Sequence, residues 1–105
     1  MNIKKELKDD IIKFSLDGRL DSTTAVQLEA DIQLEIENQL IIGDLKTLIF
    51  DLQGLDYISS AGLRVILSAK KAMDKLSGTF IVKGINREVR EVFKMTGFQK
   101  VLNVE

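Results

Sequence analysis

The stretch Thr47-Leu48-Ile49-Phe50-Asp51-Leu52 is mainly apolar and does not alternate apolar with polar positions. This pattern is typical of a strand buried on both faces within a parallel sheet. Downstream, Ser60–Leu76 carries apolar residues at three- and four-residue steps, which predicts an amphipathic helix that ends at Gly78. A buried strand followed by such a helix predicts an α/β domain.

Two strands and a helix are predicted upstream of this pair. Residues 3–7 predict a first strand, and residues 10–17 predict a second whose apolar residues share one face: Ile12, Phe14 and Leu16. Asp9-Asp10 predicts the turn between them, and Gly18 is expected to end the second strand. The cluster Asp21-Ser22-Thr23-Thr24 supplies N-cap residues for a helix that runs to about Leu40, with Gly43 as its stop.

The C-terminal third continues the alternation of strands and helices. Thr79–Lys83 predicts a strand, Arg87–Met95 a short helix, and Val101-Leu102 a last short strand. The resulting order is β-β-α-β-α-β-α with that final strand. It predicts one α/β domain over residues 1–105, with a mixed or mostly parallel sheet of about four or five strands and about three or four helices.

Composition excludes several classes of function. The 105 residues include no Cys and no His, so the chain has no thiolate nucleophile, no Cys- or His-based metal site and no Ser-His-Asp triad. The 15 basic residues nearly balance the 16 acidic ones, which argues against direct DNA binding. The seven glycines match neither GxGxxG nor GxxxxGK[ST]. We therefore expect a binding domain rather than an enzyme, with no cofactor and no metal.

Targeting signals and membrane spans are not evident in the sequence. The chain opens Met1-Asn2-Ile3-Lys4-Lys5-Glu6, which lacks an apolar signal segment. No apolar run approaches the ~20 residues of a membrane span. We therefore expect a cytoplasmic protein without membrane insertion.

Charge is distributed unevenly along the chain. Between Leu20 and Leu45 there are six acidic residues and no Lys or Arg, whereas Arg64–Lys100 holds nine basic residues against three acidic ones. The simpler interpretation is two solvated helix faces of opposite sign. The alternative is a surface that steers a charged partner.

The segment from Asp56 to Arg64 joins the buried strand to the following helix, at the end of a sheet where ligands and partners commonly bind. In a purely structural interpretation, Ser59 or Ser60 caps the helix and Gly62 allows close packing of its first turn. In a functional interpretation, a serine here accepts a phosphoryl group. The free N–H groups and the helix dipole stabilise its oxygens, and its added charge disrupts a docked interface.

Four segments of this chain resemble the STAS family, and specifically the bacterial anti-sigma factor antagonists. They resemble, in order, its Gly-x-Leu-Asp element, its buried strand, its Ser-x-Gly-Leu phosphorylation motif and its Phe-x-Met-[ST]-Gly-Phe/Leu segment: Leu16–Asp21, Leu48–Leu52, Ser60–Leu63 and Phe93–Phe98. Together these segments span nearly the whole chain in the family's order. The resemblance implies the STAS fold.

The resemblance also implies a regulatory cycle. The unphosphorylated domain would bind an anti-sigma factor that is also a GHKL-type serine kinase, and so release a sigma factor. Phosphorylation would reverse the binding, and a PP2C-type phosphatase would reset it. The motif places the acceptor at Ser60. Many members carry Asp before the acceptor, where this chain has Ser59, so Ser59 is the alternative acceptor. The implied partner-binding residues surround this motif: Asp21, Ser22, Tyr57, Ile58, Ser59, Ala61, Gly62, Leu63 and Arg64.

Other functions are compatible with the same motifs. The chain could serve as a STAS accessory subunit of a lipid or anion transport assembly, with Ser60 only a helix cap. A structural subunit of a stress-sensing assembly ranks lower, because no partner-sensing N-terminal domain is found. An enzyme ranks last, since no pair of Asp or Lys residues has a spacing that selects a site.

Overall fold

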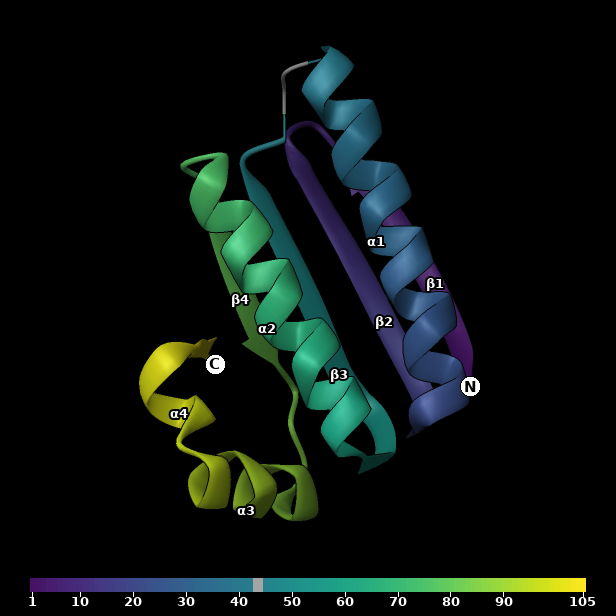
Figure 1. The fold of residues 1–105 in the computed structure, drawn as a ribbon, viewed down its shortest axis with the longest axis vertical. Helices are drawn as coiled ribbons and strands as arrows, with labels where there is room; N and C mark the ends of the chain where they lie inside the picture. The colour runs from purple at the N-terminus through teal and green to yellow at the C-terminus, as the bar shows by residue number, and fades with distance from the viewer. Residues whose placement is uncertain (43–44) are drawn as a thin grey trace.

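The computed structural model describes residues 1–42 and 45–105. Within these residues, five strands form one mixed sheet in the spatial order β1-β2-β3-β4-β5 (Figure 1). The strands are β1 (Asn2–Lys8), β2 (Ile11–Leu20), β3 (Thr47–Ile58), β4 (Thr79–Lys83) and β5 (Asn103–Val104). Only β1 is antiparallel to its neighbour, and the other pairs are parallel. The predicted α/β class and mixed sheet are confirmed.

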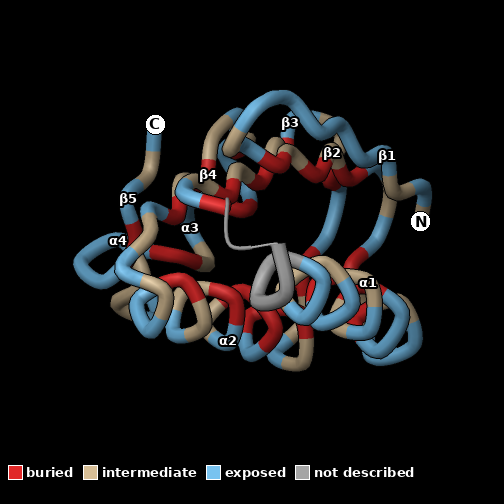
Figure 2. Tube along the Cα trace, turned by 90° about the horizontal axis from the view of Figure 1, so that it is seen from above, coloured by how far each residue is buried: buried red, intermediate tan, exposed pale blue. Residues whose placement is uncertain are grey.

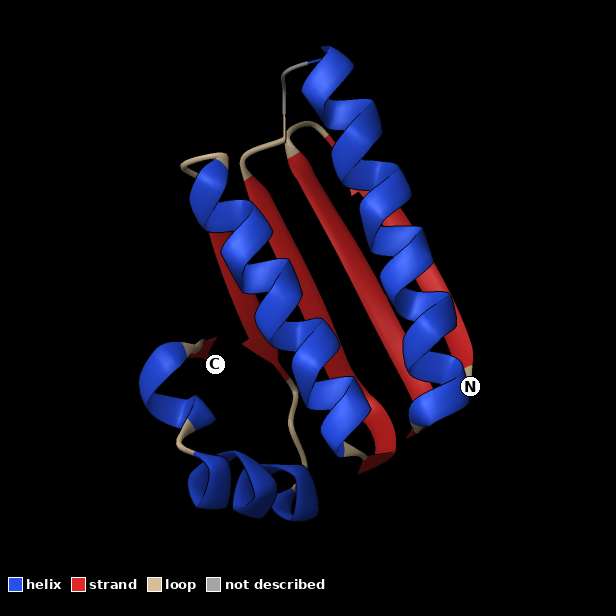
Figure 3. Ribbon diagram, viewed as in Figure 1, coloured by secondary structure: helices blue, strands red, loops and turns tan. Residues whose placement is uncertain are grey.

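The helices of the described chain are α1 (Ser22–Ile42), α2 (Ser60–Lys75), α3 (Arg87–Thr96) and α4 (Phe98–Val101). The two long helices, α1 and α2, lie side by side over one face of the sheet (Figure 3). Right-handed crossovers that always step to the next strand in the same direction place their helices on the same face, which explains this arrangement. The expected helix stop at Gly43 lies outside the described residues.

The core lies between the sheet and these helices, and buried residues concentrate on that side of the strands (Figure 2). On β3, Leu48, Phe50 and Leu52 are buried, whereas the alternate residues Thr47 and Ile49 are only half-buried. The prediction of burial on both faces of this strand was therefore wrong, because none of the helices in the described part of the chain covers the second face of β3. The Phe50 ring makes edge-to-face contacts with the rings of Phe14 and Phe80, at centroid distances of 5.8 and 5.0 Å. These contacts link β2, β3 and β4 within the core.

Two strand ends differ from the prediction. Gly18 does not end β2. It adopts φ +103° between two register shifts, and the strand continues to Leu20. This bulge needs a residue that tolerates the left-handed region. Likewise β3 continues past Leu52 to Ile58, because pairing with β2 persists through Leu20 opposite Ile58.

The C-terminal elements also differ from the prediction. Val101 ends α4 rather than forming a strand, and β5 begins at Asn103. Gly97, with φ +78°, ends α3 in the left-handed conformation and redirects the chain into α4. The turn predicted at Asp9-Asp10 is confirmed, with Asp9 at φ +55°.

The two edges of the sheet are guarded in different ways. The outer strand β1 is exposed at most positions and carries Lys4, Lys5 and Lys8. The opposite edge strand, β5, is only two residues long.

Candidate partner-binding site at the paired helix starts

The end of the sheet holds two helix starts next to each other. Strands β2 and β3 are parallel neighbours, and their last residues, Leu20 and Ile58, are paired. Helix α1 begins two residues after Leu20, at Ser22, and α2 begins two residues after Ile58, at Ser60. The Ser59 N–H donates a hydrogen bond to the Leu20 carbonyl at 2.9 Å, which ties the two connections together. Both helices therefore present their N-terminal ends on the same rim of the molecule.

Helix α2 is capped by Ser59. Its backbone is extended (φ −93°, ψ 172°), and its Oγ accepts a hydrogen bond from the Gly62 N–H at 3.2 Å. The sequence left Ser59 and Ser60 open as caps, and Ser60 as the cap is wrong. Ser60 is instead the first helical residue and is exposed. The Ser59 hydroxyl is engaged in holding the helix, whereas the Ser60 hydroxyl stands on the rim.

Helix α1 has a reciprocal cap made by two side chains. Asp21 Oδ1 accepts the Thr24 N–H at 3.0 Å, and Thr24 Oγ1 accepts the Asp21 N–H at 2.9 Å. The same Asp21 oxygen also accepts the Thr23 N–H at 3.1 Å. The Thr24 N–H first, and then the Thr24 hydroxyl, hold the pKa of Asp21 below its ordinary value, because both bonds favour the ionised carboxylate.

Gly62 sets how closely α2 approaches the sheet. A Cβ at this position would lie 2.7 Å from Leu20 Cγ and 2.9 Å from Leu20 Cδ2. Leu20 is fully buried, so it has little room to move. The glycine predicted to allow close packing does so, and it keeps Ser60 near the end of β2.

The residues predicted to bind a partner divide by exposure. Ser22, Tyr57 and Arg64 are exposed, and three more of these residues are half-buried: Asp21, Ser59 and Ala61. The other three are buried residues and can only shape the rim: Ile58, Gly62 and Leu63. Ser22, Ala61 and Arg64 line a common hollow of about 500 Å³ between the two helices. The structure thus brings residues from both connections to one surface.

Sequence reasoning missed Arg19. Its guanidinium lies 4.1 Å from the centroid of the Tyr57 ring, its cross-strand neighbour. Thr24 Oγ1 also donates to the Arg19 carbonyl at 2.8 Å, which joins this residue to the cap of α1. The bulge at Gly18 sets the register that pairs Arg19 with Tyr57, and no local sequence pattern reveals that register.

Two kinds of feature are absent from the part of the chain that the structure describes. No group of three or more Asp and Glu side chains gathers there that could hold a metal ion. Across residues 1–42 and 45–105, no helix combines the length and apolar character needed to cross a membrane.

This chain is similar to proteins of a known family. The sequence matches the family described as the STAS domain over residues 2–105. The chain belongs to the STAS domain family. A relative from Bordetella bronchiseptica that is named as an anti-sigma factor antagonist, BtrV, is 34% identical over 104 residues, which cover 99% of this chain and 85% of the relative.

Solved structures share the STAS fold at lower identity. An anti-sigma factor antagonist from Mycobacterium paratuberculosis superposes with a TM-score of 0.83 at 23% identity, over 98% of this chain and 83% of the other. The phosphorylated form of the Bacillus cell fate determinant SpoIIAA superposes with a TM-score of 0.76 at 21% identity, over 99% and 91%. At these identities the likeness establishes the fold.

The four STAS-like segments take different places in this fold. Leu16–Asp21 ends β2 and leads to α1, and Ser60–Leu63 opens α2, so these two meet at the rim. Leu48–Leu52 lies within β3. Phe93–Phe98 connects α3 to α4, where Phe93 is buried 6.1 Å from the Phe98 ring. The last two segments contribute to the core through their buried residues: Leu48, Phe50, Leu52 and Phe93.

Proposed function

We propose that this STAS domain is an anti-sigma factor antagonist that is switched by phosphorylation of Ser60. The observation that carries the proposal is the exposed hydroxyl of Ser60 at the first position of α2, beside the start of α1. The name of the BtrV relative supports the same function. The unphosphorylated rim would bind the anti-sigma factor and so free a sigma factor.

Ser60 is a better acceptor than Ser59 on structural grounds. The Ser59 hydroxyl accepts the Gly62 N–H, and phosphorylation would disturb that cap. At the first helical position, a phosphate on Ser60 lies near N–H groups that have no partner within the helix. Arg64 follows one turn later and is exposed, so it can pair with the phosphate. The helix therefore tolerates the modification.

The switch follows from charge. The kinase would supply ATP, the Ser60 oxygen would form a bond to the γ-phosphorus, and the bond to ADP would break as the hydroxyl proton leaves. The product carries about 1.5 to 2 negative charges in the middle of the docking surface. A PP2C-type phosphatase would transfer the phosphoryl group to water and restore the serine. In this cycle the domain itself needs no catalytic residue.

Phosphate incorporation with the kinase of the same organism tests the acceptor. Wild type and Ser59→Ala should both gain one phosphate, whereas Ser60→Ala should gain none while still binding the kinase. The matched control is Ser22→Ala, which removes the equivalent first-turn hydroxyl of α1. Label that survives Ser60→Ala and disappears with Ser59→Ala would contradict the assignment.

A pull-down from native lysate tests the partner class. The proposal expects a GHKL-type kinase, whereas subunits of an ABC transporter would support the transport alternative. That alternative treated Ser60 as the cap of α2, a role that Ser59 performs. Since the proposed partners act on transcription, the proposal places the protein in the cytoplasm.

A further inference from the structure

The groove between α1 and α2 extends beyond the rim. The hollow at the helix starts and a second one of about 500 Å³ share four lining residues, so they form one continuous groove: Glu29, Val65, Ser68 and Lys71. On α1 this groove runs from Ser22 to Glu37. At a rise of 1.5 Å per residue that is ~22 Å, or about four helical turns. We call this feature the interhelical groove.

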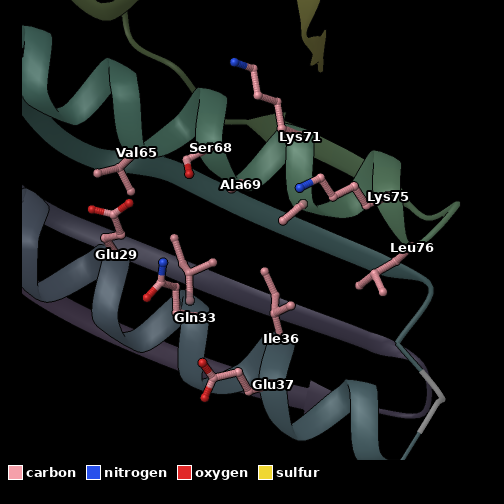
Figure 4. A pocket seen from close by; sticks show the side chains of 12 residues that line it. Glu29, Gln33, Ile36, Glu37, Val65, Ser68, Ala69, Lys71, Lys75 and Leu76 are labelled. Atoms are coloured by element: carbon pink, nitrogen blue, oxygen red, sulfur yellow. The ribbon is translucent and has the colours of Figure 1, made fainter.

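The interhelical groove has an apolar floor and oppositely charged walls. The floor is formed by six side chains from the two helices: Ile32, Ile36, Val65, Ala69, Ala72 and Leu76. Glu29 and Glu37 line the α1 side, and Lys71 and Lys75 line the α2 side. In Figure 4 the Lys75 side chain runs back along α2, whereas Lys71 extends away from α1. The lysine stems are flexible, so both ammonium groups can reach an occupant.

Among the described side chains, the acidic residues of the α1 wall and the lysines of the α2 wall do not pair with each other across the groove. No ion pair joins α1 to α2 within the residues that the structure describes, although the two helices are in contact. Small residues on the α2 side, Ser68, Ala69 and Ala72, leave room between the walls. An occupant with a basic edge toward α1 and an acidic edge toward α2 would complement both walls at once.

We infer that this groove receives an amphipathic helix of the anti-sigma factor, continuing the contact made at the Ser60 rim. A helix satisfies its own backbone hydrogen bonds, so it can lie on an apolar floor without leaving polar groups unpaired. An extended peptide would leave N–H and C=O groups unpaired, because both walls are helices. The partner helix has an apolar stripe flanked by Lys or Arg on the α1 side and by Asp or Glu on the α2 side.

This inference rests on the proposed function and adds a charge polarity to it. Because the partner is anchored at the rim, its helix has a fixed direction in the groove and cannot turn round to match reversed walls. The polarity of the two walls, rather than the net charge of the domain, therefore determines affinity.

Two variants measured by calorimetry against the anti-sigma factor recovered in the pull-down test this inference. Lys71→Glu/Lys75→Glu should weaken binding about tenfold, as expected for the loss of two charge contacts. Adding Glu29→Lys and Glu37→Lys restores the net charge of −1 but reverses both walls. This quadruple variant should bind at least as weakly as the double variant. Circular dichroism and thermal unfolding check that both variants fold.

The possible outcomes distinguish a failure of the groove inference from a failure of the proposed function. Arg90→Glu/Lys94→Glu, on the exposed side of α3, makes the same change in charge outside the groove and should leave affinity within about twofold. Recovery of wild-type affinity by the quadruple variant would show that only net charge matters and would overturn the inference. Dodecanoate binding in the groove, with anti-sigma factor affinity unchanged in both variants, would assign it to a small amphiphile. Failure of wild type to bind any anti-sigma factor would instead overturn the proposed function.

Discussion

The two helix starts at the rim are alike in position and different in charge. Helix α1 is capped by a carboxylate, Asp21, in a reciprocal arrangement with Thr24. Helix α2 is capped by the neutral hydroxyl of Ser59, its first turn contains no acidic residue, and the Ser59 N–H bonds to the neighbouring strand end instead. The positive end of the α1 dipole already faces an anion, whereas that of α2 does not. The difference explains why an added phosphate suits Ser60 better than Ser22.

The largest expected effect comes from adding negative charge at Ser60, and the equivalent serine of α1, Ser22, provides the comparison. Phosphorylation of Ser60 should weaken anti-sigma factor binding about a hundredfold, or ~2.8 kcal/mol, and Ser60→Asp should weaken it by less because Asp carries less charge. Calorimetry with phosphorylated protein gives the first value. Ser22→Asp, at the same position of α1, is the matched control and should have a smaller effect. Equal affinity of the phosphorylated and unmodified proteins would contradict the switch.

The close approach of α2 gives the next largest effect. Gly62→Ala should destabilise the fold by about 1 to 3 kcal/mol, because the new Cβ meets the buried Leu20 side chain. Thr24→Ala, at the corresponding position of α1, should cost about 1 kcal/mol through lost hydrogen bonds. Urea unfolding measures both. A Gly62→Ala protein as stable as wild type would show that α2 can shift outward freely.

The neutral cap has a smaller contribution. Ser59→Ala removes the acceptor for the Gly62 N–H and should lower the free energy of unfolding by about 1 kcal/mol. Ser60→Ala, one residue later, removes a hydroxyl outside the cap and should leave stability within about 0.5 kcal/mol of wild type. Chemical denaturation of the two variants side by side measures the difference. The reverse order of effects would move the cap to Ser60.

The smallest expected effect is a difference between the two caps in how their contributions to stability depend on pH. The pKa of Asp21 is lower in the folded state, so its ionised form contributes stability above the ordinary Asp pKa, and this contribution is lost as pH falls through the folded pKa. The melting temperature of wild type should exceed that of Asp21→Asn at neutral pH, and the gap should shrink in acid. The gap between wild type and Ser59→Ala should stay constant, because that cap does not ionise. A pH-independent gap for Asp21→Asn would exclude the carboxylate's role.

Regular patterns in the sequence predicted most of the fold. The alternation of Ile12, Phe14 and Leu16 gave one face of β2, and the helical stripe after Ser60 gave α2. The limits of β2 and β3 were missed, since Gly18 continues a strand through a bulge, which depends on pairing with a distant segment. Burial of only one face of β3 depends on the direction of every crossover, which the pattern of a single strand does not contain.

The candidate site was predicted in part. The motif located Ser60 and the nearby Asp21, but two adjacent serines have the same capping propensity. Ser59 rather than Ser60 is the cap because of where β3 ends. The Ser59 N–H donates a hydrogen bond to the Leu20 carbonyl, so the Ser59 backbone stays extended. Arg19 was missed for a similar reason, as its contact with Tyr57 requires the register across two strands.

The two protected edges of the sheet have a consequence for how copies of this protein associate with one another. Lysines along β1 disfavour the addition of another strand, and β5 offers too few backbone groups to template one. Growth of the sheet by strand exchange or edge-to-edge stacking is thereby discouraged at both margins. Crowding many copies together should consequently yield separate particles rather than fibrils.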